Sequence, residues 1–384
     1  MKNNITTLYI FKFFKDFLLI APVIIPFYRA NGLSATEILT IQAIFSASML
    51  VFEIPSGYLS DRWGRKGTLC LGGFSMVAGF LVYSFSVSVP FFILAELLLG
   101  FAFSMISGTD SALLYDTLKK SGHTDDYHAI EARAESATRI GSAISSIGGG
   151  LLASVSIRLP FLANALSALV LPISALTLSE VPREKAHHKN VLSGIAEAVL
   201  YAIQNPHIRR AGLASGAIMT TGIISIWGYF LILEQIAFPL GLYGLMFFFF
   251  QSFSALGARL SRIISAKTGK GFEWLLILTI SFVLISIALF PSPLTIVLAF
   301  LHSFCWGLSS PHFLTIINSK AREDIRATVL STMSMISRGI YVLCGPLFGM
   351  IVDKGGTGRG FIFLAIICGL CFLPTILRAV DKGH

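Results

Sequence analysis

The chain has 384 residues, of which 54% are hydrophobic and 13% charged, and its formal net charge is +9. This composition excludes an ordinary soluble domain and indicates an integral membrane protein. The positive charge would also suit nucleic-acid binding, but its placement argues against that partner. With a cytoplasmic N-terminus, the inner segments between the apolar runs hold 21 lysines and arginines and the outer segments hold four. This bias follows the positive-inside rule, so we expect a multi-pass protein of the cell membrane with both termini cytoplasmic.

About 20 mostly apolar residues cross the hydrocarbon core of a bilayer. Runs of that length predict twelve transmembrane helices, at about 6–28, 38–60, 67–89, 91–115, 135–156, 159–179, 209–234, 239–263, 273–290, 293–317, 326–351 and 360–379. The second half repeats the layout of the first, which predicts six-helix bundles over 1–180 and 209–384. The cytoplasmic linker between them, 181–208, has apolar residues at helical spacing, so we expect an amphipathic helix there. The predicted fold class is all-α and integral membrane, with two pseudo-symmetric bundles.

The first span carries charged residues and prolines. Lys12 and Asp16 are four residues apart, so they share one helix face and could form a pair. Asp16 lies about 15 Å from the start of the span, near the bilayer centre, and should face the bundle interior. Pro22 and Pro26 interrupt the regular hydrogen bonding, so the backbone there needs another polar partner.

Charged residues of other spans lie at a similar depth to Lys12. Glu53 in the second span and Asp110 in the fourth are each about 10 Å from the inner end of their helix. This predicts a buried cluster of one ammonium group and two carboxylates. Asp16, Glu53 and Asp110 are our candidates for proton coupling, because burial favours the protonated form of a carboxyl group. The alternative is that Lys12 neutralises the carboxylates permanently and the cluster only fixes helix packing.

The link between the second and third spans concentrates glycine and charge. It reads Glu53-Ile-Pro-Ser-Gly57-Tyr-Leu-Ser-Asp61-Arg62-Trp-Gly64-Arg65-Lys66. Gly57 would let helices approach closely, and Gly64 would allow a backbone conformation that a Cβ resists. The charged residues can satisfy one another and the nearby helix ends. Three further glycines, 148–150 in the fifth span, require close packing or a bend to offset their low helix propensity.

This order of Gly, Asp, Arg, Gly, Arg and Lys between two spans resembles the signature of the major facilitator superfamily. It looks closest to bacterial, drug-efflux-like members that read Phe-Glu-Ile-Pro-(Thr/Ser)-Gly before the link. The resemblance covers the whole chain and implies a secondary transporter that works by alternating access. It also implies a latch in which Asp61, Arg65 and Asp116 dock on the inner end of the eleventh span. The residues assigned to this latch are Gly57, Asp61, Arg62, Gly64, Arg65, Lys66 and Asp116.

The resemblance and the repeat place a substrate cavity near mid-membrane between the halves. The candidates for lining it are the polar and aromatic residues Lys12, Gln42, Trp227, Tyr229, Gln251, Trp306 and Arg338. Arg338 lies about 20 Å into its span, so it should contact either an anionic or zwitterionic substrate or a packing carboxylate.

Three functions are consistent with these patterns. The first, which we favour, is proton-coupled export of small amphiphilic compounds. The second is import or facilitated passage of a nutrient, metabolite or siderophore-like organic anion. The third, an intramembrane enzyme or receptor, lacks supporting hydrolase and P-loop motifs. An arginine in the fourth span and a Gly-Pro pair in the fifth, which are common in drug/proton antiporters, are absent. We expect a monomer whose partners are a small-molecule substrate, protons and lipid, with no cofactor and no metal.

Overall fold

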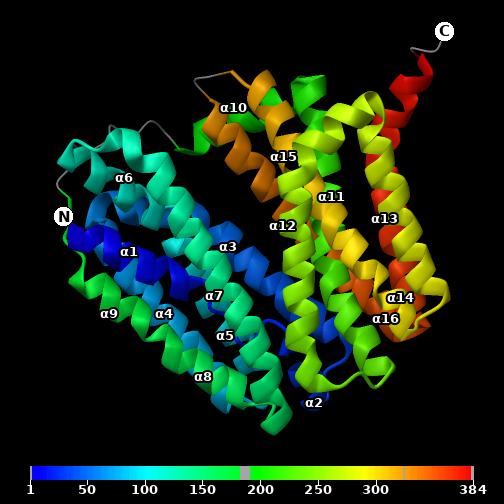
Figure 1. The fold of residues 1–384 in the computed structure, drawn as a ribbon, viewed down its shortest axis with the longest axis horizontal. Coiled ribbons are helices and arrows are strands. Elements are labelled where there is room, and N and C mark those ends of the chain that lie inside the picture. Colours follow the sequence, from blue (N-terminus) through cyan, green and yellow to red (C-terminus); the bar gives the residue numbers. More distant parts are fainter. Residues whose placement is uncertain (1, 182–190, 323–324, 382–384) are drawn as a thin grey trace. The chain divides into compact units, whose positions relative to one another are not determined.

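The computed structural model describes residues 2–181, 191–322 and 325–381, and all regular secondary structure in them is helical (Figure 1). The elements are α1 (Lys2–Lys15), α2 (Ile24–Ala30), α3 (Ala35–Trp63), α4 (Arg65–Phe85), α5 (Val89–Ile106), α6 (Thr109–Ser121), η1 (Thr124–Asp126), α7 (Tyr127–Val155), α8 (Leu159–Ala168), α9 (Val170–Thr177), α10 (Val191–Gln204), α11 (Pro206–Gln235), η2 (Leu240–Leu242), α12 (Tyr243–Thr268), η3 (Gly269–Gly271), α13 (Phe272–Leu289), α14 (Pro293–Ile296), α15 (Leu298–Lys320) and α16 (Arg326–Asp381).

Within the described residues, nine helical segments are long and apolar enough to cross a membrane. The predicted eleventh and twelfth spans both lie in α16, where Gly356 has a non-helical backbone with φ 83° and ψ 164°. The first predicted span is divided between α1 and α2, so neither piece reaches the length of a span. The fifth corresponds to α7, which is 29 residues long but rich in glycine and serine.

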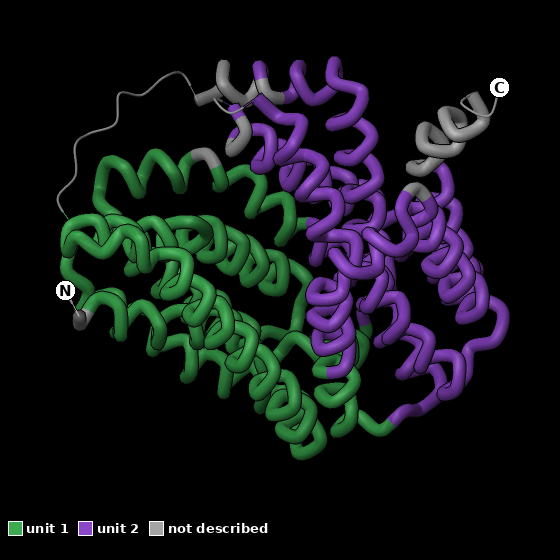
Figure 2. The backbone as a smooth tube through the Cα atoms, turned by 45° about the horizontal axis from the view of Figure 1, so that its top comes forward, with its two compact units in different colours: residues 1–32, 44–187, 239–248 green, residues 33–43, 188–238, 249–384 purple. Residues whose placement is uncertain are grey.

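The chain forms two compact units (Figure 2). Unit 1 comprises Met1–Gly32, Ile44–His187 and Pro239–Phe248, and unit 2 comprises Leu33–Ala43, His188–Phe238 and Phe249–His384. The predicted halves, 1–180 and 209–384, differ from these units because the start of α3 and the start of α12 each belong to the other unit. Part of the predicted linker, 182–190, lies outside the described residues, and α10 is the helix in its described part.

The start of α3 packs within unit 2 because a side chain of α16 caps it. The Asp353 carboxylate accepts hydrogen bonds from the backbone N–H groups of Ala35 and Thr36, at 2.9 and 2.8 Å, and from the Thr36 hydroxyl at 2.5 Å. The first N–H groups of a helix have no partner inside the helix, and they favour a negative charge. A residue more than 300 positions away in the sequence therefore satisfies the N-terminus of α3.

The break between α1 and α2 follows the predicted effect of Pro22. Backbone groups that lose their helical hydrogen bonds at this break pair with one asparagine. Asn164 on α8 accepts a hydrogen bond from the Ile20 backbone N–H at 3.2 Å and donates one to the Phe17 carbonyl at 3.1 Å. One side chain thus supplies both a donor and an acceptor where the helical hydrogen bonds are lost. Asn164 is only 1% exposed, so water does not readily replace it.

The glycines of α7 allow it to pack closely against α1 and against the residues of the break that follows α1. A Cβ on Gly149 would collide with the carbonyl oxygen of Leu19, and one on Gly141 would lie against that of Phe13. Small residues allow such backbone-to-backbone approach between membrane helices. The close packing expected for this part of the fifth span is therefore present, and it brings α7 against α1.

Candidate functional site

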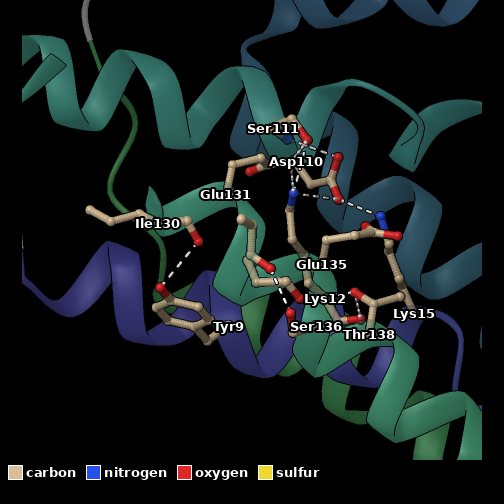
Figure 3. Close-up of polar contacts among 12 residues, drawn as sticks. Tyr9, Lys12, Lys15, Asp110, Ser111, Ile130, Glu131, Glu135, Ser136 and Thr138 are labelled. Carbon is tan, nitrogen blue, oxygen red and sulfur yellow. Dashed lines mark hydrogen bonds and ion pairs between the residues drawn. The ribbon is translucent and has the colours of Figure 1, made fainter. Parts of the chain in front are cut away.

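Lys12 lies at the centre of a buried charge cluster that joins three helices of unit 1 (Figure 3). Its ammonium group forms a close ion pair with the Glu131 carboxylate on α7 and lies 3.8 Å from Asp110 Oδ2 at the start of α6. The Lys12 and Asp110 side chains are only 1% and 2% exposed. Charges this deeply buried need opposite charges and hydrogen bonds, because they have lost their water.

Lys15 supplies a second ammonium group. Its Nζ donates a hydrogen bond to Asp110 Oδ2 at 2.8 Å. Lys12 and Lys15 are three residues apart on α1 and therefore face the same side of that helix. The other carboxylate oxygen of Asp110, Oδ1, accepts from the Ser111 backbone N–H at 2.8 Å, within the first turn of α6. Free N–H groups at a helix start stabilise a negative charge.

The Ser111 hydroxyl connects the two sides of the cluster. It accepts a hydrogen bond from Lys12 Nζ at 2.8 Å and donates one to Glu131 Oε1 at 2.6 Å. Thr138, further along α7, donates to the backbone carbonyl of Lys12 at 2.9 Å and fixes α7 against α1. Two lysines, two carboxylates and a hydroxyl thus form one continuous network. Chemically, such a network can bind a proton at a carboxylate and rearrange its hydrogen bonds while remaining buried.

Asp110 occupies a helix start because the predicted fourth span is not one continuous helix. Helix α5 ends at Ile106 and α6 begins at Thr109. Between them Gly108 has φ 74°, in the left-handed region that glycine adopts without steric cost. This turn breaks the helix just before Asp110, so the carboxylate receives a backbone N–H that a continuous helix would not offer.

Two of the predicted pairings with Lys12 are wrong. Asp16 is not paired with Lys12, because α1 ends at Lys15 and the helical spacing does not extend to residue 16. The charged groups that act on Asp16 are instead Lys15, Arg139, Glu135 and Asp110. The second carboxylate beside Lys12 is Glu131 and not Glu53.

Glu131 is not among the predicted site residues because the predicted fifth span begins only at about residue 135. The structure continues α7 back to Tyr127, so Glu131 lies in the first turns of that helix. Glu131, Glu135 and Thr138 follow at helical spacing, four and then three residues apart, so they share one face. That spacing is the signal in the sequence that identifies Glu131 as a partner for α1.

The charged link between α3 and α4 forms a second cluster in unit 1. Arg65 Nε lies 3.0 Å from Asp116 Oδ2 on α6, which brings together two of the residues assigned to the latch. Gly64 has φ 93° and ψ 158°, as expected of a position that resists a Cβ. Its neighbour is Glu180, which the sequence analysis did not assign to the latch. The Glu180 carboxylate accepts from the backbone N–H groups of Arg65 and Lys66 at 2.9 and 2.8 Å and so caps α4.

The remaining latch residues lie at the surface of unit 1. Asp61 and Arg62 are exposed, and Arg62 donates a hydrogen bond to the Tyr58 hydroxyl at 3.0 Å. No described atom lies within 4 Å of where a Cβ on Gly57 would be, so unit 1 itself places no helix against this glycine, and the close approach stays a prediction. Docking of this cluster on the eleventh span stays a prediction.

The other six residues proposed to line a cavity all belong to unit 2. Tyr229 is buried and lies beside His302, while Trp227 donates a hydrogen bond to the Tyr341 hydroxyl at 3.2 Å. The Trp306 ring packs over Gly222. Of the other three residues, Gln42 is buried, and Gln251 and Arg338 are half-buried.

A sequence model of the Major Facilitator Superfamily matches residues 6–343 of the chain. The chain belongs to the major facilitator superfamily. Members of this superfamily are membrane transporters rather than enzymes, so the enzyme alternative is set aside. The all-helical membrane fold predicted from the sequence is confirmed.

Individual relatives are distant. The Quinolone resistance protein NorA of Staphylococcus aureus (strain MRSA252) is 24% identical over 183 residues, covering 47% of this chain and 46% of the relative. An uncharacterized transporter of Buchnera aphidicola subsp. Schizaphis graminum (strain Sg) is 38% identical over 77 residues, covering 20% of this chain and 19% of the relative. The chain thus spans about half or less of the length of the curated relatives it matches.

Solved superfamily structures are similar over nearly the whole chain. A mutant of the nucleoside transporter NupG aligns with a TM-score of 0.82 at 14% identity, covering 97% of this chain and 99% of the other. A bacterial homolog of the human lysosomal transporter Spinster aligns with a TM-score of 0.78 at 15% identity, covering 97% and 95%. At these identities the likeness concerns the fold.

Proposed function

We propose that this transporter exports small amphiphilic compounds in exchange for protons by alternating access. The observation that carries the proposal is the network of Lys12, Lys15, Asp110, Ser111 and Glu131 in unit 1, in which Lys12 and Asp110 are fully buried. The partial similarity to a quinolone resistance protein supports export, although it covers less than half of the chain.

The network gives a physical route from proton binding to helix movement. A proton on Asp110 or Glu131 removes a negative charge, so the buried Lys12 or the partly buried Lys15 loses an ionic partner. An unpaired buried ammonium group is strongly unfavourable, whereas the paired group is tolerated. Protonation therefore favours a rearrangement of α1 against α6 and α7, and deprotonation restores the ion pairs.

The test uses purified protein in liposomes with an imposed pH gradient and the aromatic cation ethidium as substrate. We expect the gradient to drive ethidium transport by the wild type and not by Asp110→Asn or Glu131→Gln. The matched control is Asp126→Asn, which removes the charge of an exposed carboxylate just before α7 and away from the network. Gradient-driven transport that is unchanged in both network variants would remove the proposed proton site.

The same assay compares Glu131 with Glu53, which the sequence predicts as a proton-coupling residue although it is not the partner of Lys12. Loss of coupling in Glu53→Gln alone would assign the proton site to Glu53, and loss in Glu131→Gln alone would assign it to the network around Lys12. We expect the larger loss for Glu131→Gln, because Glu131 is the carboxylate paired with Lys12.

Import of an organic anion is the alternative function. It predicts that the anion fluorescein, and not ethidium, accumulates in the same liposomes. Such a result would replace export by import while leaving membership of the superfamily intact.

A further inference from the structure

A second group of buried polar side chains lies in unit 2, where α11 packs against α15. The Tyr229 hydroxyl and His302 Nδ1 are hydrogen-bonded at 2.5 Å. Tyr229, His302 and Ser225 are 1%, 2% and 0% exposed. Ser225 and Tyr229 are four residues apart on α11, so their side chains lie on the same side of that helix.

One polar atom of this group, the second ring nitrogen of His302 (Nε2), has no hydrogen-bond partner among the described residues. The Ser225 hydroxyl lies within reach of the Tyr229 hydroxyl and keeps further capacity to donate or accept. Buried polar atoms are almost always paired in native proteins, because an unpaired one has lost water without compensation. A molecule that binds during function can supply the missing hydrogen-bond partner of such an atom.

The surroundings of these polar atoms are aromatic. The Tyr229 ring stacks on Phe361 with centroids 5.4 Å apart, and it lies 5.6 Å from the ring of Phe250. Trp306 follows His302 by one helical turn on α15. Cys305 is a further neighbour of Tyr229. The site thus combines an unpaired histidine nitrogen and two hydroxyl groups with apolar rings.

We propose that Ser225, Tyr229 and His302 form a subsite that binds an uncharged hydroxyl group attached to an aromatic ring of the transported compound. This proposal rests on the proposed export of amphiphilic compounds and names the part of the substrate that unit 2 recognises. When the Tyr229 hydroxyl donates to Nδ1, His302 Nε2 carries a hydrogen and donates; in the other tautomer it accepts. A hydroxyl group can both donate and accept, so it matches either tautomer and the Ser225 hydroxyl.

A site of this kind discriminates against a molecule that lacks the hydroxyl group, since the histidine nitrogen then stays unpaired. The test measures binding of two cations to purified protein in detergent without a pH gradient. One is (6-hydroxy-2-naphthyl)methyl-trimethylammonium, and the other is the same cation without the hydroxyl group. We expect the wild type to bind the hydroxylated cation about tenfold more tightly, which corresponds to about 1.4 kcal/mol.

Three variants assign that preference to the subsite. His302→Leu should abolish the tenfold ratio, and Ser225→Ala, which removes a single oxygen, should lower it to about threefold. The control His312→Gln changes another histidine of α15 outside the subsite and should leave the ratio at tenfold. Because the readout is a ratio between two matched cations, a general loss of stability does not reproduce it.

Two outcomes overturn the proposal. One is a ratio that stays near tenfold in both His302→Leu and Ser225→Ala, and the other is a wild type that binds neither cation or shows no preference. Binding is measured without a proton gradient, so a failure of proton coupling in liposomes leaves this result unaffected. Absence of gradient-driven transport together with a tenfold binding ratio would reject the coupling and retain the subsite.

Discussion

Lys12 and Lys15 are three residues apart on α1, and this spacing decides which carboxylates each ammonium group contacts. Lys12 pairs with Glu131 on α7 and Asp110 on α6, whereas Lys15 pairs with Asp110. Asp110 is therefore shared between two cations, and Glu131 is the carboxylate that depends on Lys12. At the scale of single residues, the composition of the cluster depends on which side chains contact one face of α1.

Gly64 shows how strongly one backbone conformation constrains a residue. We expect Gly64→Ala to lower the unfolding free energy by about 1–3 kcal/mol, because φ 93° with ψ 158° is a region that residues with a Cβ rarely adopt. A Cβ there would also lie 2.8 Å from the Glu180 carboxylate that caps α4. The measurement is thermal unfolding of the purified protein.

Gly57 provides the control for that substitution. It lies inside α3, with no described atom near the position of its Cβ. Gly57→Ala should be neutral or stabilising, because alanine favours a helix by about 1 kcal/mol over glycine. Equal destabilisation by both substitutions would contradict the backbone explanation for Gly64.

Two helix interruptions organise unit 1 at the scale of its elements. The break between α1 and α2 ends the helix at Lys15, and the turn at Gly108 starts a new helix just before Asp110. Each interruption is next to a charged residue of the cluster. The site therefore depends on where helices stop as well as on how they pack.

Asn164 should be essential to the first interruption. Asn164→Ala removes the partners of the Ile20 N–H and the Phe17 carbonyl, and each buried group left unpaired costs about 1–3 kcal/mol. We expect a clear fall in unfolding temperature. Ser167→Ala on the same helix loses only a bond to its own helix backbone and should change the unfolding temperature little.

Asp353 should stabilise the start of α3 from α16. Asp353→Ala removes all three capping hydrogen bonds, and loss of such a cap costs about 0.5–2 kcal/mol. Hydrogen exchange should accelerate at residues 35–38, while the centre of α3 stays protected. The control is Lys354→Gln, a change at the adjacent exposed residue. Unchanged exchange in Asp353→Ala would show that the cap contributes nothing to the order of this helix.

At the scale of the whole molecule, the charge bias between the helices predicts how the chain crosses the membrane. Val87, between α4 and α5, should face outside, and Asp125, between α6 and α7, should face the cytoplasm. In a protein whose native cysteines are replaced, a membrane-impermeant maleimide should label Val87→Cys in intact cells. It should label Asp125→Cys only after the membrane is opened. The reverse pattern would invert the predicted topology.

The sequence alone determined the membrane location, the helical class and membership of the superfamily. These follow from composition, from the lengths of apolar runs and from the short motif at residues 57–66, which are all properties of contiguous sequence. It also placed Lys12 and Asp110 at a common depth, because depth depends only on helical rise.

Only the tertiary structure decided which residues form ion pairs and hydrogen bonds with one another. Glu131 pairs with Lys12 across 119 positions of sequence, Asn164 satisfies a break 144 positions away, and Tyr229 meets His302 across 73. Each of these contacts depends on the rotation of a helix about its axis and on the residue where a helix ends. Apolar residues all around a membrane helix leave both of these undetermined, since lipid and protein neighbours are equally apolar.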